Sequence, residues 1–314
     1  MSLSNADLAK KGFWNARYWY EWLIEKLIYI AGGFSIAIIV LIFVFLLRDS
    51  LPFFTTYHYS LREILFGTTW SPTADKFGGA PLIAGTLVVT ALAIAIALPL
   101  GVIAAVYVGA IAPVRVREIL KPVIELIAAI PSVVVGFIGL ALIGPALFRF
   151  SQGHGNILQM SSSMSALAAG IMLAFMALPT IVSVAEDAIR AVPRDYQEGA
   201  LALGATRLET LVRITLPASL SGIVAAVMLG VGRAIGETMV VLMVAGNSPQ
   251  IPEGWWGIFQ PVRTMTAAIA AEAGETAQGG AHYSALFVIG LFLFLITFGV
   301  NFTADRLVRR KGGK

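Results

Sequence analysis

The sequence predicts an all-α membrane protein, a bundle of six transmembrane helices, from three observations. Of 314 residues, 58% are hydrophobic and only 13% are charged, with a mean hydropathy of +0.83, whereas a soluble domain carries about 25% charged residues. Several uncharged runs approach the ~20 residues that a helix needs to cross the hydrocarbon layer. The alternating pattern of a membrane barrel is absent, so the spans must be helices, which satisfy their own backbone hydrogen bonds.

The N-terminal segment, residues 1–26, precedes the first apolar run. Its stretch FWNARYWYEWLIEKL places Trp14, Trp19 and Trp22 among charged residues. Because Trp and Tyr favour the headgroup level, we expect a short helix that lies at the membrane surface. The apolar run that follows lacks a small-x-small cleavage site at its end, so we expect it to remain as the first span.

The spans and their orientation follow from hydropathy and from the positions of Lys and Arg. Sixteen of the 22 basic residues fall in the N-terminal segment, the second and fourth connections and the C-terminal tail; five fall in the other connections, and Arg233 lies within a span. Basic residues favour the cytoplasmic side, which places both termini in the cytoplasm. The spans are expected at 27–47, 82–111, 122–148, 166–186, 218–246 and 283–304, before a cytoplasmic tail at 305–314.

Proline and glycine mark the irregular parts of the chain. The two long outward connections, 48–81 and 247–282, are rich in Gly, Pro and Trp. Prolines also fall inside the spans, among them Pro131 and Pro179, and each removes a backbone hydrogen bond. We expect these prolines to kink their helices, which a bundle tolerates where neighbours satisfy the freed carbonyl.

The fourth connection, 187–217, predicts two short helices joined by a glycine bend. Asp195 has the form of a helix start, and Gly204 is expected to end this first helix in the left-handed conformation. Thr206 and Glu209 then have the spacing of a capping box, which opens the second helix.

The second helix of this connection is expected to end at Leu216-Pro217, which leads into the fifth span. The pair of helices has an apolar side that it cannot bury alone. Either the chain's own bundle or a partner protein must cover it. That side consists of Leu201, Leu203, Leu208 and Leu211.

The same connection is similar to the EAA loop of ABC importer permeases. The resemblance rests on a Glu-small-Ala triplet, a glycine four residues later and an Ile-x-Leu-Pro ending. Gly199 stands where the family has Ala, but both residues are small. In that family the loop docks into a cleft of the ATP-binding subunit, which implies a coupling role for Glu198, Gly199, Ala200, Gly204, Ile214, Leu216 and Pro217.

The resemblance continues over residues 64–304, where AIPSVVVGF, GRAIGETMVVLMVAGN and PVRTMTAAIA look like the PstC-type subunits of phosphate importers. It implies the MetI-like permease fold, with residues 27–304 as the transmembrane domain and 187–217 as its coupling loop. It also implies that the chain is the non-catalytic permease of an ATP-driven importer that translocates phosphate.

The resemblance further implies partners. These are a second permease of PstA type, two cytoplasmic ATP-binding subunits of PstB type, and an extracytoplasmic phosphate-binding protein of PstS type. ATP and Mg²⁺ would be bound by the ATP-binding subunits, because this chain has no G-x-x-x-x-G-K-[ST] sequence of its own. Trp255 and Trp256 are candidate contacts for the binding protein, although anchoring at the lipid headgroups explains them equally well.

The stretch GRAIGETMVVLM places two charges in the fifth span, Arg233 and Glu237. Each costs on the order of 2.5–3.5 kcal/mol in mid-membrane, and four residues apart on a helix they can pair. We expect Arg233 to attract an anion that crosses the bundle and Glu237 to neutralise it when the path is empty. The alternative is a salt bridge that locks two helices or subunits. Possible hydroxyl donors to the anion are Thr238, Ser132 and Thr180.

Other function classes have less support from the sequence. A secondary transporter or channel that works alone would show repeated halves, and none is evident. A membrane enzyme is a more distant alternative, since neither a nucleophile–base motif nor a metal-ligand spacing occurs. The net charge of +4 does not indicate nucleic-acid binding, and the absence of cysteine excludes thiolate metal sites.

The choice of anion stays open, because Arg and hydroxyl groups would also suit sulfate or molybdate.

Overall fold

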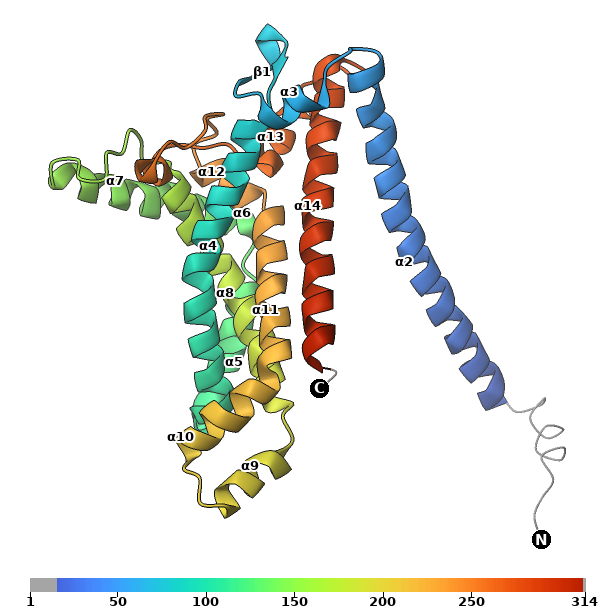
Figure 1. The fold of residues 1–314 in the computed structure, drawn as a ribbon, viewed down its shortest axis with the longest axis vertical. Helices are drawn as coiled ribbons and strands as arrows, with labels where there is room; N and C mark the ends of the chain where they lie inside the picture. The colour runs from blue at the N-terminus through green and yellow to red at the C-terminus, as the bar shows by residue number, and fades with distance from the viewer. Residues whose placement is uncertain (1–15, 313–314) are drawn as a thin grey trace. The chain divides into compact units, whose positions relative to one another are not determined.

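The computed structural model describes residues 16–312, which are mostly helical (Figure 1). Residues 1–15 and 313–314, including Trp14, lie outside the described part. Three π-helical turns, Tyr107–Ile111, Gly139–Ile143 and Leu211–Thr215, join neighbouring helices. The helices and strands are α2 (Ala16–Thr55), α3 (Leu61–Phe66), β1 (Trp70–Ser71), β2 (Lys76–Phe77), α4 (Ala80–Val106), α5 (Val114–Ala128), α6 (Ser132–Ile138), α7 (Gly144–Gly153), α8 (Ala166–Arg190), α9 (Arg194–Ala202), α10 (Arg207–Thr210), α11 (Leu216–Gly236), α12 (Met239–Val244), α13 (Met265–Glu272) and α14 (Ala281–Gly312).

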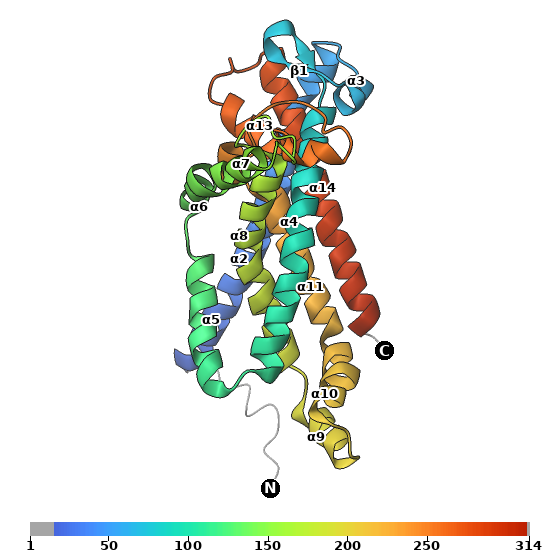
Figure 2. The same ribbon diagram turned by 90° about the vertical axis from the view of Figure 1, so that its left-hand side faces the viewer.

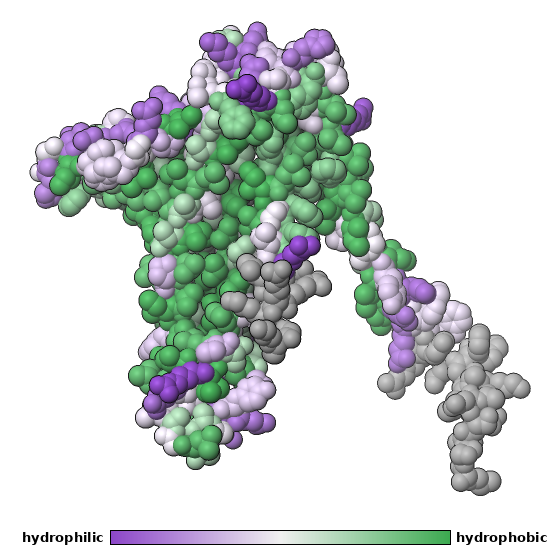
Figure 3. Space-filling model, viewed as in Figure 1, coloured by the Kyte–Doolittle hydropathy of each residue, from purple (hydrophilic) through white to green (hydrophobic). Residues whose placement is uncertain are grey.

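The prediction of six spans is confirmed. Within the described residues, six helical segments are long and apolar enough to cross a membrane. Hydrophobic side chains cover the flank of the bundle in Figure 3, and polar side chains gather at its two ends. This distribution is the one that a helix bundle needs in lipid, where the outside is apolar and the ends meet water.

The chain forms two compact units, one up to Asp49 and one from Ser50 onward. The first unit contains most of α2, whose described side chains are nearly all exposed. The boundary expected at residue 27 is not a helix boundary, because α2 runs without interruption from Ala16 to Thr55. Whether its first turns lie at the membrane surface stays a prediction.

The core of the second unit is a tight contact of α4, α8 and α11, which lie side by side in Figures 1 and 2. Ile181 of α8 is fully buried between two glycines. A Cβ at Gly101 of α4 would come within 2.8 Å of the Ile181 side chain, and one at Gly230 of α11 within 2.6 Å. Glycine at these positions therefore sets how closely the three helices approach.

Two of the expected spans are broken helices. The third span was predicted as 122–148, but α5 ends at Ala128 and α6 begins at Ser132, because Pro131 has no N–H to continue the ladder. In Figure 2, α5 runs along the bundle, while α6 and α7 turn away from its direction. The fifth span was predicted as 218–246, but α11 ends at Gly236 and the chain becomes helical again only in α12.

Polar contacts to Glu272 join the two outward connections and the start of α14 at the end opposite to α9. Glu272 of α13 lies 2.5 Å from Arg263 Nη1 and 2.6 Å from His282 Nε2, and it accepts the indole N–H of Trp70 at 3.2 Å. Arg263 is buried, and its backbone lies directly against Gly85 of α4. This buried arginine therefore has an acidic partner.

We expect a larger side chain at Gly230 to destabilise the protein more than the same change at a free glycine. Gly230→Leu would overpack the contact with Ile181, which costs about 1–3 kcal/mol. Gly299→Leu in α14 is the matched control, since nothing lies within 4 Å of its Cβ position. Thermal unfolding of the purified protein in detergent measures both. Equal melting temperatures for the two variants would contradict the close approach.

Candidate translocation site

The candidate site lies where the third and fifth spans are broken. Glu237 follows the last residue of α11 in an extended conformation, with φ −70° and ψ 131°. Helix α6 packs along α12, and a Cβ at Gly136 would lie 3.3 Å from Met239 O. A Cβ at Gly139 would lie 2.7 Å from Val244. The two half-helices therefore run in the same direction, with their N-terminal ends on the same side.

Arg233 lies in the last turn of α11 and is half-buried. Its Nη1 donates a hydrogen bond to Thr180 Oγ1 of α8 at 2.9 Å. Among the ion pairs of residues 16–312 none involves Arg233. The guanidinium is thus oriented by a neutral hydroxyl, and its positive charge is not compensated by a carboxylate.

Glu237 does not pair with Arg233, so that expectation is wrong. The helix ends at Gly236, which removes the shared face that a spacing of four residues would give. The Glu237 carboxylate instead caps α12, where Oε1 accepts from the backbone N–H of Met239 at 3.2 Å and of Val240 at 3.4 Å. These N–H groups are otherwise unsatisfied, and the helix dipole favours a negative charge there.

The other predicted hydroxyls are not gathered around Arg233 in the described residues. Thr238 donates to the carbonyl of Gly236 at 3.4 Å. Ser132 is the first residue of α6 and is partly exposed. Of the three hydroxyls proposed from the sequence, Thr180 is therefore the one that contacts Arg233.

Threonines that the sequence analysis did not select surround the other side of Glu237. Thr266 Oγ1 donates to the Glu237 carbonyl at 2.9 Å and lies 3.1 Å from Thr264 Oγ1. Thr86 of α4 accepts from the backbone N–H of Met265 at 3.0 Å. The two threonines of VRTMTAAIA, Thr264 and Thr266, are visible in the sequence. Only the folded second outward connection, however, brings them to the break between α11 and α12.

The helix pair of the fourth connection forms as expected. Gly204 has a φ of +89°, and the capping box is complete, with Thr206 N–H to Glu209 Oε2 at 2.9 Å and Glu209 N–H to Thr206 Oγ1 at 3.2 Å. Leu203 is 92% exposed and Leu208 is 69% exposed. The alternative that this chain's own bundle covers the apolar side is therefore wrong.

The end of this helix pair differs from the expectation. Leu216-Pro217 does not break the second helix, because α10 passes through the π-helical turn at Leu211–Thr215 directly into α11. Pro217 is the second residue of α11, which directly follows the π-helical turn. Of the residues proposed for coupling, Glu198, Gly199 and Ala200 lie on α9, and no atom lies within 4 Å of a Cβ placed at Gly199.

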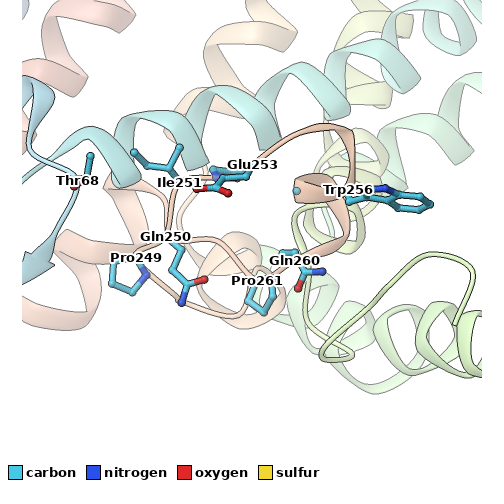
Figure 4. Close-up of a pocket in the computed structure, with 10 residues that line it drawn as sticks. Thr68, Pro249, Gln250, Ile251, Glu253, Trp256, Gln260 and Pro261 are labelled. Atoms are coloured by element: carbon cyan, nitrogen blue, oxygen red, sulfur yellow. The ribbon is translucent and has the colours of Figure 1, made fainter.

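A hollow of about 790 Å³ opens at the end opposite to α9 (Figure 4). Thr68 of the first outward connection lines it together with Gln250, Glu253, Trp256 and other residues of the second. Trp255 next to it is 64% exposed. The lining contains one carboxylate and is otherwise uncharged, so it does not attract anions by itself.

A bundle of broken helices around an arginine that pairs with no carboxylate of residues 16–312, with an exposed helix pair at one end, is typical of a membrane permease. The chain belongs to the family of binding-protein-dependent transport system inner membrane components, which matches residues 97–313. It is thus the non-catalytic, multi-pass permease subunit of an ABC importer in the inner membrane, which excludes a transporter that works alone.

Relatives and solved structures agree with this assignment. The chain is 39% identical to the probable ABC transporter permease protein YqgH of Bacillus subtilis, over 84% of this chain and 82% of the relative. It is 36% identical to the phosphate transport system permease protein PstC of Haemophilus influenzae, over 75% of this chain and 77% of that relative.

Two solved ABC importers have the same fold. A bacterial alginate importer matches 93% of this chain and 99% of its own, with a TM-score of 0.58 and 16% identity. The methionine transporter MetNI matches 73% and 91%, with a TM-score of 0.51 and 20% identity. These matches confirm the MetI-like fold.

We expect Glu237→Ala to destabilise the protein more than Glu237→Gln. Glutamine keeps an oxygen that can accept from the Met239 and Val240 N–H groups, whereas loss of a helix cap costs about 1 kcal/mol. Thermal unfolding measures both variants, with Glu253→Ala in the exposed connection as control. The same loss for Gln and Ala would show that the side chain does not cap α12.

Proposed function

We propose that this chain is the PstC-type permease of an ATP-driven phosphate importer. The observation that carries the proposal is Arg233, a cation in the apolar bundle that is oriented by Thr180 and pairs with no carboxylate in the described part of the chain. An intramembrane charge commonly marks a substrate path. The relatives that are PstC proteins of phosphate transport systems support phosphate as the anion.

The guanidinium would bind the anion as it passes. It has five N–H donors in a planar fork that suits an oxyanion, and the hydrogen bond to Thr180 occupies one of its nitrogens. Glu237, held on α12 by backbone N–H groups, leaves the arginine charge available and limits the local net charge when the path is empty.

The exposed α9–α10 pair would dock on the cytoplasmic ATP-binding subunits, which hold ATP and Mg²⁺. The exposure of Leu203 and Leu208 supports a partner surface there. Glu198, Gly199, Ala200 and Gly204 would face that subunit, and the turn at Ile214, Leu216 and Pro217 would carry its movement into α11. Both termini would then lie in the cytoplasm.

The opposite end would receive the extracytoplasmic binding protein, and a PstA-type permease would complete the pore. The hollow beside Trp255 and Trp256 suits a docking surface because it is formed by both outward connections. Sulfate and molybdate have the same tetrahedral oxyanion geometry. Binding of a panel of tetrahedral anions to the purified complex therefore decides the substrate.

We expect Arg233→Gln to reduce phosphate uptake by about 10- to 100-fold, the loss that corresponds to charge-assisted hydrogen bonds. Arg233→Lys should be intermediate, because it keeps the charge but not the planar fork. Uptake into vesicles that contain the assembled transporter measures both, with Arg149→Gln in the exposed part of α7 as control. An assembled Arg233→Gln transporter with wild-type uptake would refute the anion path.

We expect Gly204→Asp to abolish coupled uptake and Gly204→Asn to preserve much of it. Both side chains tolerate the left-handed conformation better than most, but the aspartate would place a carboxylate in the contact with the ATP-binding subunit. Co-purification of that subunit and ATP-driven uptake are the measurements. Undiminished uptake in Gly204→Asp would count against α9 as the docking element.

A further inference from the structure

Glu186 is a buried carboxylate that the candidate translocation site does not include. It lies near the α9 end of α8 and is 1% exposed. Its Oε2 accepts from Lys121 Nζ of α5 at 2.8 Å, and its Oε1 from Arg190 Nη1 at 3.2 Å. Lys121 also reaches Asp187 Oδ1 at 2.9 Å. These four residues form an ion-pair cluster, and Lys121 is its member on α5.

The other neighbours of α8 at this end are held by close packing. A Cβ at Gly109, beyond α4, would lie 3.2 Å from Ile189, and Gly222 of α11 lies directly against Ala188. Such contacts leave little freedom of movement, because interiors packed this tightly resist displacement. At the α9 end of α8, we therefore expect α4, α8 and α11 to move together as one body.

Helix α5 is attached to that body differently. None of its residues is buried. Ile124 packs at the edge of the apolar cluster that contains Val182 and Ala185 of α8, and an open apolar hollow of about 250 Å³ lies beside it, lined by Ile124, Ile127 and residues of α4 and α8. Arg117 fixes the start of α5 to the end of the preceding helix, where it donates to the carbonyls of Val108 and Gly109. One turn later, Lys121 supplies the ion pairs that join α5 to α8.

The two helices joined by Lys121 lead to different parts of the mechanism. α8 continues through Pro193 into α9, the element that we expect to dock. α5 continues through the break at residues 129–131 into α6, which packs on α12 beside Glu237. A movement of the α8 end can thus reach the broken helices of the site through α5.

We propose that Lys121 is a positioning residue that makes α5 follow the α9 end of α8, so that movement of the coupling helices changes the position of α6 and α12. This inference rests on the proposed ATP-driven function. A buried ion pair is seldom more stable than apolar packing. Its attraction falls slowly with distance, however, while dispersion contacts are lost within about 1 Å. A charged contact therefore holds through a change of geometry that an apolar contact would not survive.

The test compares the two cations that share Glu186. Lys121→Met removes the link between α5 and α8, whereas Arg190→Met removes an ion pair that lies within α8. Phosphate uptake and ATP hydrolysis are measured in the same vesicles with the assembled transporter. In Lys121→Met we expect uptake per ATP to fall about tenfold while hydrolysis persists. Arg190→Met should keep the wild-type uptake per ATP. Lys121→Arg should also keep it, because arginine preserves the positive charge that Lys121→Met removes.

A covalent link provides the second readout. The chain has no cysteine, so Lys121→Cys with Asp187→Cys can be joined by a bifunctional thiol reagent and released by reduction. The joined transporter should recover the coupling ratio and lose it after reduction, while treated Lys121→Cys alone should not recover.

The outcomes separate this inference from the proposed function. A wild-type transporter without ATP-driven phosphate uptake would refute the proposed function. A coupled wild type refutes the role of Lys121 if Lys121→Met keeps the normal ratio, if Arg190→Met lowers the ratio equally, or if the joined variant does not recover.

Discussion

The site depends on an arginine, Arg233, that lies inside an apolar bundle and has no acidic partner among the residues that the structure describes. An isolated arginine at mid-membrane costs on the order of 2.5–3.5 kcal/mol, and Thr180 offsets only part of that cost with one neutral hydrogen bond. The break after Gly236 maintains this state, since a continuous α11 would bring Glu237 onto the same face as Arg233 and neutralise it. Arg263 at the outward end is the contrast, because Glu272 pairs with it.

The second unit combines two kinds of helix contact. Glycines at 101 and 230 bring α4 and α11 against Ile181, which fixes the three helices as a body. The contact between α5 and α8 combines the ion pairs of Lys121 with the packing of Ile124 beside an open apolar hollow. A permease needs both kinds of contact. One part must keep its shape when the ATP-binding subunits move the coupling helices, while another part must change position.

The sequence predicted those features that local chemistry determines. The capping box at Thr206 and Glu209 and the left-handed Gly204 need only neighbours in the chain, and both occur as predicted. The helix breaks could not be located in the same way. Pro131 indicated a kink, but the separation of α5 from α6 depends on the packing of α6 against α12. Glu237 caps α12 because α11 ends at Gly236. The spacing of four residues had instead predicted a pair with Arg233 on a continuous helix.

The π-helical turn at Leu211–Thr215 has a consequence for how α11 can move. A π turn accommodates one residue more than the α-helical ladder needs, so the chain has one residue of slack between α10 and α11. If this turn changed to α geometry, every residue beyond it would rotate by about 100° around the helix axis, since an α-helix has 3.6 residues per turn. The direction in which Arg233 points from the helix axis therefore depends on the hydrogen-bond register of Leu211–Thr215, a turn of five residues that lies more than four helical turns away.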